Sequence, residues 1–381
     1  MAEGKLLYCI NHTELEHSHV YLEQPTVLKF VQTDGNEMKT GKSLEYFKAP
    51  ELTAYPLLLN IGHYKEKSVE SKLKCTEMME RFVIEKGFYN ATSTDRYKVI
   101  TRRHVLGTIL TAPYFYYDKS IIVIKHKNLI FILMEDNNTN TNELRKMHHK
   151  FEKYCGADYP TVEPCADDNE ERFFVYGAKL GKFDLFYSGL ASMVMSDERI
   201  EDLTDMGAIN NCPFILTKLM LEGKKLYWWK TGAVLKWWSQ ARFSNVNNIF
   251  VGFKDDQGVV NKPAILATVA DLIKFQYKRT RVCEGFLHTF LNLVLETMSD
   301  VDDPGTMYKY QFDTEGNIRY SFHNVDEELP IFSDDFFNIY EKALKLDYIL
   351  RYFTCQRSSA IFKCKCIFCT YSSKAKQHIF F

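Results

Sequence analysis

Short apolar runs and alternating segments recur along the chain, and most of them predict β-strands. Residues 121–124 and 129–134 are almost entirely apolar and are separated by a polar turn, which predicts a buried hairpin. Residues 183–195 alternate between large apolar and small or polar side chains, as a strand does. Residues 308–312 and 318–322 flank a turn that contains Asp, Gly and Asn. They therefore predict a second hairpin.

Four longer segments carry apolar residues at helical spacing. Residues 68–86 begin at a capping serine, keep their apolar positions on one side and end before a glycine. Residues 144–154 predict another helix, and residues 227–243 are helical in pattern and contain all four tryptophans. An apolar stripe at helix spacing also runs through residues 287–298. Because strands and helices alternate without a repeat or a long linker, we expect the α/β (or α+β) class.

The same pattern divides the chain into three parts. Residues 1–45 are polar and mixed, and we expect an N-terminal segment there. Residues 46–345 hold the predicted strands and helices and are expected to form one domain, in which the Asn/Thr tract at residues 137–142 is a solvated loop. Residues 346–381 are rich in cysteine and are expected to form a C-terminal extension.

Composition narrows the classes of protein to consider. Hydrophobic residues make up 46% of the chain and aromatic residues 14%, which argues against disorder over most of its length. The formal net charge is −1, so a surface coated with positive charge is not expected, although a local basic cleft is compatible with this balance. The first residues do not resemble a signal peptide, and no apolar run is long enough to span a membrane. Six scattered cysteines before residue 284 fit reduced thiols, and we expect a nuclear or cytoplasmic protein.

Several motifs, in a consistent order, resemble the DXO family of RNA decapping nucleases. Residues 236–240 read Lys-Trp-Trp-Ser-Gln, and paired tryptophans followed by a small residue and glutamine are rare. Residues 251–258 resemble the strand and turn that follow this helix in the family. Residues 143–144, 150–152 and 157–158 resemble the family's second motif. Arg103, followed by Thr-Ala-Pro-Tyr at residues 111–114, resembles the first motif. The resemblance covers roughly residues 58–345.

The resemblance implies a fold and a chemistry. The fold would be a single domain of two mixed β-sheets with flanking helices. The activity would be metal-dependent hydrolysis at an RNA 5′ end, which removes incomplete or non-standard caps and sometimes degrades the RNA further. In the family, two Mg²⁺ ions are held by carboxylates from the motifs G-φ-x-φ-E, E-φ-D and E-φ-K, where φ is an apolar residue.

This sequence departs from the family at most of those carboxylates. The G-φ-x-φ-E motif keeps its acid as Glu152 but not its glycine. Leu190 and Ser192 stand where the two acids of E-φ-D are expected. The acid of E-φ-K is replaced by Ile215 or Leu216, depending on a one-residue choice of register, and only its lysine remains, as Lys218. One carboxylate cannot hold two Mg²⁺ ions usefully, so the departures argue against catalysis.

The surviving positions suggest an RNA-binding set. Arg103, Lys218 and Gln240 are the candidates for contacting RNA, because a guanidinium or ammonium group matches phosphate oxygens. For Arg103 there is a simpler alternative, in which it or its neighbour Arg102 faces solvent. Glu152 is a candidate metal ligand, or else a solvated or paired acid on a helix. The adjacent tryptophans at 237 and 238 are expected in the core.

Other acids and histidines are weaker metal candidates. His148 and His149 are adjacent, and adjacent helix positions point about 100° apart, so the two cannot easily chelate one ion. Asp184, Asp197 and Glu198 flank the missing E-φ-D pair and are either relocated ligands or solvated acids at strand ends.

The C-terminal extension carries a possible zinc site. Its soft ligands fall within 25 residues and could form a tetrahedral Zn²⁺ site, although their spacing is not that of a standard zinc finger. The interleaved Lys, Phe and Ile residues could equally form a small hydrophobic flap. The candidate ligands are Cys355, Cys364, Cys366, Cys369 and His378.

These observations lead to three hypotheses about function. The first is a degenerate DXO-like pseudoenzyme that binds RNA 5′ ends weakly, without a catalytic Mg²⁺ cofactor, and acts in RNA metabolism or quality control. The second is an active decapping hydrolase and exonuclease with rearranged ligands. The third is a protein-interaction scaffold in an RNA-processing complex. No membrane partner is expected, and the oligomeric state is left open.

Overall fold

The computed structural model describes residues 4–34, 37–39, 43–60, 69–88, 96–115, 118–134, 143–162, 164, 171–224, 232–274, 276–302, 305–324 and 336. The chain forms two compact units, residues 1–75 with 95–326 and residues 76–94 with 327–381. Both large sheets belong to the first unit. Across the described ranges, no helix combines the length and the apolar character that a bilayer crossing needs.

The larger sheet has ten strands and mixes parallel with antiparallel pairs. β10 and β11 form an antiparallel hairpin, whereas β11 runs parallel to β6 and β6 runs parallel to β8. In spatial order, the strands are β1 (Lys5–Cys9), β18 (Asn317–Asn324), β17 (Thr306–Phe312), β7 (Lys119–His126), β8 (Leu129–Met134), β6 (Tyr97–Arg102), β11 (Phe183–Leu190), β10 (Glu171–Leu180), β2 (Thr26–Asp34) and β3 (Glu37–Lys39).

The second sheet has six strands and is also mixed, because β13 runs parallel to β14 and antiparallel to β12. In spatial order, its strands are β16 (Ile265–Thr268), β14 (Val246–Lys254), β13 (Phe214–Leu221), β12 (Met193–Val194), β4 (Tyr46–Phe47) and β9 (Gly156–Ala157). A small two-stranded sheet pairs β5 (Leu57–Leu58) with β15 (Val259–Val260).

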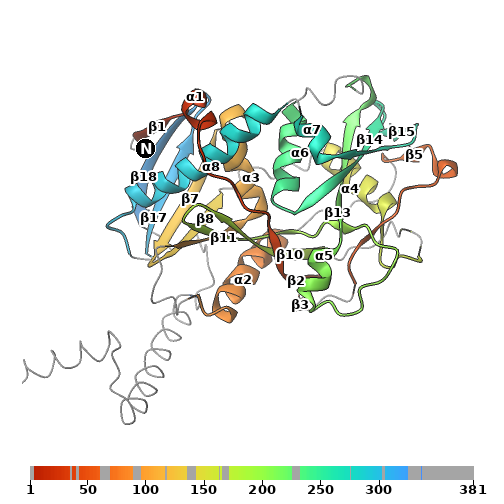
Figure 1. Cartoon of the computed structure of the whole chain (residues 1–381), viewed down its shortest axis with the longest axis horizontal. Helices are drawn as coiled ribbons and strands as arrows, with labels where there is room; N and C mark the ends of the chain where they lie inside the picture. The colour runs from red at the N-terminus through yellow and green to blue at the C-terminus, as the bar shows by residue number, and fades with distance from the viewer. Residues whose placement is uncertain are drawn as a thin grey trace, which may run out of the picture. The chain divides into compact units, whose positions relative to one another are not determined.

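Helices flank both sheets. Figure 1 shows α8 crossing the ten-stranded sheet in front of β17 and β7, and Phe290 of α8 packs against Tyr310 of β17. The helices are α1 (His12–Glu16), α2 (Val69–Glu85), α3 (Arg103–Thr111), α4 (Glu143–Cys155), α5 (Met206–Asn211), α6 (Gly232–Arg242), α7 (Val269–Ile273) and α8 (Tyr277–Thr297), with short 3₁₀ turns η1 (Leu52–Ala54) and η3 (Ala112–Tyr114).

Among the described residues, the first unit contains a larger and a smaller hydrophobic cluster. The larger contains side chains from both sheets and from α3, α6 and α8, including Phe174, Phe214 and Phe286. Trp237 and Trp238 belong to it, as predicted. The smaller cluster joins α4 to the six-stranded sheet through Phe151 and its neighbours. Each sheet thus buries an apolar face, which is what stabilises a layered fold.

Most of the predicted elements are confirmed. The predicted hairpins are β7–β8 and β17–β18, and the predicted helices include α2, α4 and α8. The expected class, with two mixed sheets and flanking helices, is confirmed as well. The predicted N-terminal segment, residues 1–45, contributes β1, β2 and β3 to the ten-stranded sheet. The domain boundaries stay predictions.

Residues 183–195 were predicted to form one strand but form two. It forms β11 up to Leu190 and then β12, and these two strands belong to different sheets. Ala191 and Ser192 lie between the two strands and carry the chain from one sheet to the other. Alternation alone cannot reveal such a transfer, because the pattern of large and small residues continues through it. Of the predicted helix at residues 227–243, the structure describes α6 from Gly232 to Arg242. Residues 225–231 lie outside the described residues.

Candidate functional site

Arg103 lies where two parallel strands end. It is the first residue of α3 and directly follows β6, which runs parallel to β11 with Arg102 opposite Ser188. The Arg103 Nη1 donates a hydrogen bond to the Ser244 Oγ at 2.6 Å. The Ser244 Oγ donates in turn to the backbone carbonyl of Gln240 at 2.7 Å. The end of α6 therefore holds the Arg103 guanidinium over the end of β11.

Gly189 permits this close approach. A Cβ atom at residue 189 would lie 2.8 Å from the Arg103 Nε and 3.0 Å from its Cβ, which is closer than real Cβ contacts allow. The Arg103 side chain therefore rests directly on the β11 backbone. A larger residue at position 189 would have to displace it.

Buried hydroxyl groups surround Arg103. Tyr176 and Tyr187 are paired across β10 and β11 with their rings stacked at 5.5 Å, and both are fully buried. Among the described residues, the hydroxyls of Tyr176, Tyr187 and Ser192 have no hydrogen-bond partner of ordinary geometry. Burial raises the pKa of Tyr176, and the nearby Arg103, Ser192 and Ser244 partly offset that effect. Unsatisfied buried hydroxyls are costly, so they mark a position where a polar ligand or water would be stabilised.

Lys218 supplies a second cation. It is 8% exposed on β13, and burial lowers its pKa to about 8, with Arg103 acting in the same direction and Glu152 opposing it. Leu216 lies two residues before Lys218, so the pleat of β13 turns both side chains to one face. Ile215 faces the other way and packs in the smaller hydrophobic cluster with Phe151.

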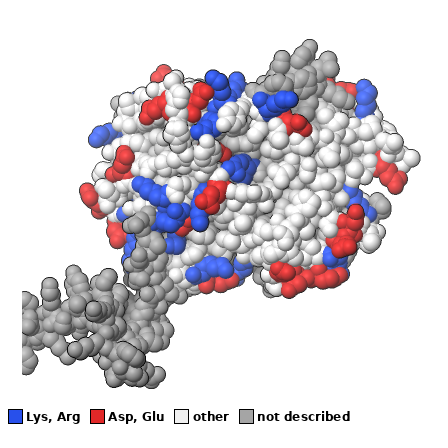
Figure 2. Space-filling model, viewed as in Figure 1, with Lys and Arg blue, Asp and Glu red and all other residues white. Residues whose placement is uncertain are grey.

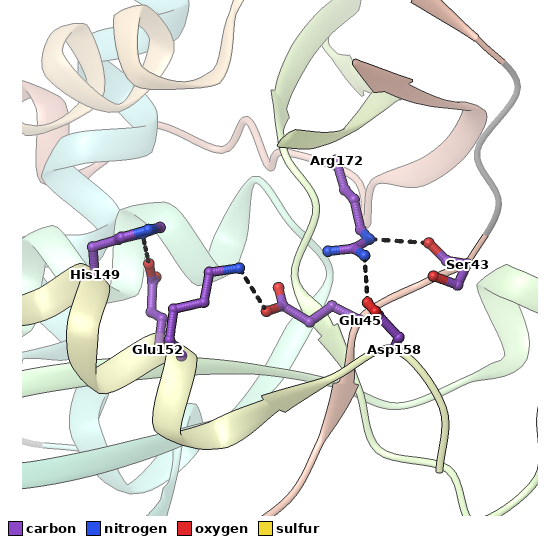
Figure 3. Close-up of polar contacts among 7 residues, drawn as sticks. Ser43, Glu45, His149, Glu152, Asp158 and Arg172 are labelled. Atoms are coloured by element: carbon purple, nitrogen blue, oxygen red, sulfur yellow. Dashed lines mark hydrogen bonds and ion pairs between the residues drawn. The ribbon is translucent and has the colours of Figure 1, made fainter. Parts of the chain in front are cut away.

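Glu152 is the acid that lies near Lys218. His148 Nδ1 and His149 Nδ1 each lie 3.6 Å from one of its two carboxylate oxygens, and the His149 contact is drawn in Figure 3. Burial favours the protonated acid, but His148, His149 and Lys218 outweigh it and lower the pKa of Glu152 to about 2. Burial lowers the pKa of His148. The His148 Nε2 forms a hydrogen bond with the Thr217 carbonyl oxygen at 2.9 Å. Glu152 is therefore ionised at neutral pH.

We call Arg103, Glu152, Tyr176, Ser192, Lys218 and Ser244 the Arg103 cluster. Its donor set does not fit two Mg²⁺ ions, which require several hard oxygen ligands, because Glu152 is its one carboxylate. Across the described ranges, no group of three or more His, Cys, Asp or Glu side chains is arranged to hold a metal ion. The cluster instead combines two cations and one acid with several hydroxyls.

A second polar network lies near α4 and differs from the Arg103 cluster in the partners of its cations. Figure 3 shows Arg172 donating to the Ser43 carbonyl and to Asp158, at 3.1 and 2.6 Å. Lys153 Nζ lies 4.0 Å from Glu45 Oε1, and Figure 3 draws this ion pair at Glu45. We call these five residues the Arg172 network. Each of its two cations has an acid partner.

Other predicted site residues lie elsewhere. Gln240 is exposed on α6, and its backbone, rather than its side chain, makes the recorded contact with Ser244. Asp184 pairs with Arg96 at 2.6 Å near the opposite end of β11, so it is not a relocated ligand at the cluster. Asp197 and Glu198 are exposed beyond β12. The five candidate zinc ligands lie outside the described residues, and their role stays a prediction that elemental analysis of reduced protein would test.

The sequence reasoning missed Tyr176, Tyr187 and Ser244. A signal for the tyrosines was present, since both occupy apolar positions of strands and a buried tyrosine usually needs a hydrogen-bond partner. Nothing local to Ser244 indicated that its hydroxyl would meet a residue 141 positions away.

The fold and this site define a class of nuclease-like protein. Residues 24–338 match the family described as RAI1 like PD-(D/E)XK nuclease. This match covers most of the chain, so the chain belongs to that family, and the predicted membership of the DXO group is confirmed.

Individual relatives agree with this assignment. The chain is 29% identical over 198 residues to the decapping and exoribonuclease protein of Bos taurus, covering 48% of this chain and 46% of that protein. It therefore spans about half the length of the curated relatives it matches. Candida albicans Rai1, solved with pU5 and Mn²⁺, has a similar fold, with a TM-score of 0.68, 17% identity and coverage of 90% of this chain and 100% of the other. Scheffersomyces stipitis Rai1, solved with (3′-NADP)⁺ and calcium, has a TM-score of 0.66 at 16% identity, with the same coverage.

Proposed function

We propose that this protein binds RNA 5′ ends through the Arg103 cluster without hydrolysing RNA by the two-metal mechanism of its family. The observation that carries the proposal is that the buried Lys218 lies near Arg103 as well as near Glu152, which is the one carboxylate of the Arg103 cluster. A two-metal nuclease needs the opposite balance, with several carboxylates to hold the ions.

The lost carboxylates make direct binding of phosphate favourable. Ser192 puts a neutral hydroxyl where the second acid of E-φ-D is expected. Leu216, on the same face of β13 as Lys218, is the better match than Ile215 for the missing acid of E-φ-K. Without these negative charges, a phosphate can approach Arg103 without a metal ion to neutralise it. Candida albicans Rai1 was solved with the 5′-phosphorylated RNA pU5 together with Mn²⁺, which supports the choice of an RNA end as the ligand.

The expected affinity is modest. Losing the ions that would bridge protein and RNA offsets the gain from removing repulsive carboxylates, so we expect binding in the micromolar range, about −8 kcal/mol. Binding should weaken as salt rises, because each neutralised phosphate releases counterions. We place this function in RNA metabolism or quality control in the nucleus or cytoplasm.

The test measures binding and turnover with the same RNA. A single strand labelled at its 3′ end and bearing a 5′-monophosphate is titrated with the full-length protein at low salt. We expect wild type to bind and Arg103→Ala to bind at least tenfold more weakly. Arg96→Ala is the matched control, because Arg96 is an equally charged residue at the far end of β11 that pairs with Asp184.

Turnover is measured with Mg²⁺ or Mn²⁺ on monophosphorylated and capped RNA, and we expect none above background. A metal-dependent product that disappears in Glu152→Ala would show instead an active nuclease with rearranged ligands. If wild type fails to bind RNA at low salt, or binds equally with and without Arg103, the role of a scaffold in an RNA-processing complex replaces the proposal.

A further inference from the structure

α3, α6 and the start of α8 carry positive charge and contain no exposed acid of their own. α3 packs against both α6 and α8, and η3 continues α3 towards α8. Residues 96–115 and 232–254 contain no Asp or Glu, nor do residues 276–283. The next acid, Glu284, is buried and paired with Arg242 at 2.9 Å. The chain as a whole has a net charge of −1, so this absence of acids is a local feature.

Aromatic rings are interleaved with these cations. The Lys236 Nζ lies 4.4 Å from the centre of the Phe115 ring, and the Arg279 guanidinium lies 5.3 Å from that of Tyr114. Tyr277, two residues before Arg279, is 62% exposed. We call these five residues the α6–α8 surface. Cations mixed with accessible rings are the usual composition of a surface that binds single-stranded nucleic acid.

The charge at the start of α8 is not explained by the stability of the helix. Three cations, Lys278, Arg279 and Arg281, occupy its first turns, and the first turn has no acid. Positive charge at a helix N-terminus opposes the macrodipole. Lys278 pairs with Glu16, and Arg281 donates to the Ser18 carbonyl. For Arg279, the described residues provide a ring but no ion pair. In Figure 2, blue side chains gather at the top of the view over the start of α8.

α6 joins this surface to the Arg103 cluster. Lys236 and Gln240 are both exposed and lie four positions apart, so they share one face of the helix, about 6 Å apart along its axis. Ser244 follows at the end of the same helix and holds Arg103. The exposed positions of α6 therefore lead from the cluster to Lys236 and the Phe115 ring.

We propose that the α6–α8 surface binds the body of an RNA strand whose 5′ end is held at the Arg103 cluster. Backbone phosphates contact Lys236 and Arg279, and bases stack on Tyr114 and Tyr277. An acidic protein segment would match the charge but would leave the exposed Tyr277 ring without a stacked base, so single-stranded RNA fits the surface better. This inference rests on the proposed function, because it takes the end of the strand to be at Arg103.

The experiment compares a short ligand with a long one, using the full-length protein. A 5′-phosphorylated dinucleotide occupies the cluster alone, whereas an unstructured RNA of about a dozen nucleotides also reaches the surface. The double variant Lys236→Ala/Arg279→Ala should bind the dinucleotide as wild type does. It should lose most of the extra affinity for the long RNA, and the slope of log affinity against log salt should fall by about 0.7 for each phosphate contact removed.

Two further variants separate stacking from charge. Tyr114→Leu should weaken binding of the long RNA roughly tenfold, whereas Tyr114→Phe should keep it, because a phenyl ring still stacks. Lys182→Ala is the control for charge and cation–ring contact. Lys182 lies 5.9 Å from the Tyr97 ring centre and 5.7 Å from that of Phe183, at the opposite end of β11 from Gly189. That variant should bind both RNAs normally.

The outcomes distinguish the two proposals. If the dinucleotide does not bind wild type, the proposed function fails. If it binds but the long RNA gains nothing, or keeps its gain in the double variant, the inference about the α6–α8 surface fails alone. If an oligo-glutamate peptide displaces the long RNA and Tyr114→Leu has no effect, the surface binds acidic protein segments and the inference is overturned.

Discussion

The Arg103 cluster and the Arg172 network contain similar side chains but differ in how well these are satisfied. In the Arg172 network, the buried guanidinium donates to a carbonyl and to Asp158, and Lys153 faces Glu45. In the Arg103 cluster, Arg103 meets a serine, and the buried Tyr176 hydroxyl lacks a partner of ordinary geometry among the described residues. Among the described residues, the cations of the Arg172 network are therefore paired with acids, whereas the Arg103 cluster keeps a buried hydroxyl without a partner of ordinary geometry.

The difference shows how to separate structural charges from functional ones in this fold. A buried cation with a matched acid is already neutralised and has no further ligand to attract. A buried cation surrounded by hydroxyls keeps its charge and offers donors to an incoming anion. Burial alone does not distinguish the regions, because Arg172 is 5% exposed and Lys218 is 8% exposed. The partners of the two arginines do distinguish them, because Arg172 pairs with Asp158 whereas Arg103 donates to the Ser244 hydroxyl.

The largest expected effect is on stability, in the Arg172 network. Arg172→Met should lower the free energy of unfolding by about 2–3 kcal/mol, because it leaves the Ser43 carbonyl without its donor and Asp158 without its cation. Asp158 is 41% exposed and can be solvated, which limits the loss. Denaturant unfolding measures the change. The matched control is Arg96→Met, which breaks a more exposed pair and should cost less than about 1 kcal/mol. Equal losses in the two variants would contradict the comparison.

A smaller effect, on RNA binding, should follow when an acid partner for Arg103 is introduced into the Arg103 cluster, as in the Arg172 network. Ser192→Asp places an acid beside the Tyr176 hydroxyl and close to Arg103. The new carboxylate should neutralise Arg103 and weaken binding of 5′-phosphorylated RNA by about 2 kcal/mol, roughly thirtyfold, in the absence of divalent metal. Ser192→Ala, which adds no charge, should weaken it much less. If the two variants bind alike, electrostatic neutralisation is not the cause.

The geometry of Arg103 can be perturbed without changing any charge. Gly189→Ala should displace the guanidinium from the β11 backbone, since the added Cβ would lie 2.8 Å from Nε. We expect RNA binding to weaken by about 1 kcal/mol, with little loss of stability because the arginine side chain can move. Anisotropy and thermal unfolding are measured on the same sample. Normal binding would mean that the position of Arg103 against β11 does not matter.

The smallest effect is a pH dependence specific to the cluster. Burial lowers the pKa of Lys218 to about 8, so Lys218 is charged below that pH and loses its charge as pH rises through it. The 5′-phosphate gains its second charge only above about pH 6. Binding should therefore be strongest between these values and decline by severalfold above pH 8. Lys218→Arg should remove the decline at high pH, because arginine stays protonated. A wild-type curve that stays flat to pH 10 would contradict a role for Lys218.

The sequence by itself determined the local elements and the family. Alternation at residues 308–312 and 318–322 predicted the hairpin β17–β18, and the apolar stripe at 287–298 predicted the second half of α8. These patterns are readable because each element buries one face whatever lies opposite it. The sequence also predicted that Leu190 and Ser192 stand at the positions of the E-φ-D acids, because the spacing within a linear motif is fixed.

Only the tertiary structure decided which residues meet. Tyr176, Ser192 and Ser244 come from a strand, a crossover between sheets and the end of a helix, and they surround Arg103 from a fourth place in the chain. The pleat of β13 placed Leu216 beside Lys218 and turned Ile215 towards Phe151. A linear pattern records which face of its own element a residue occupies. It does not record which element lies against that face, because this depends on strand order and on the packing of the two sheets.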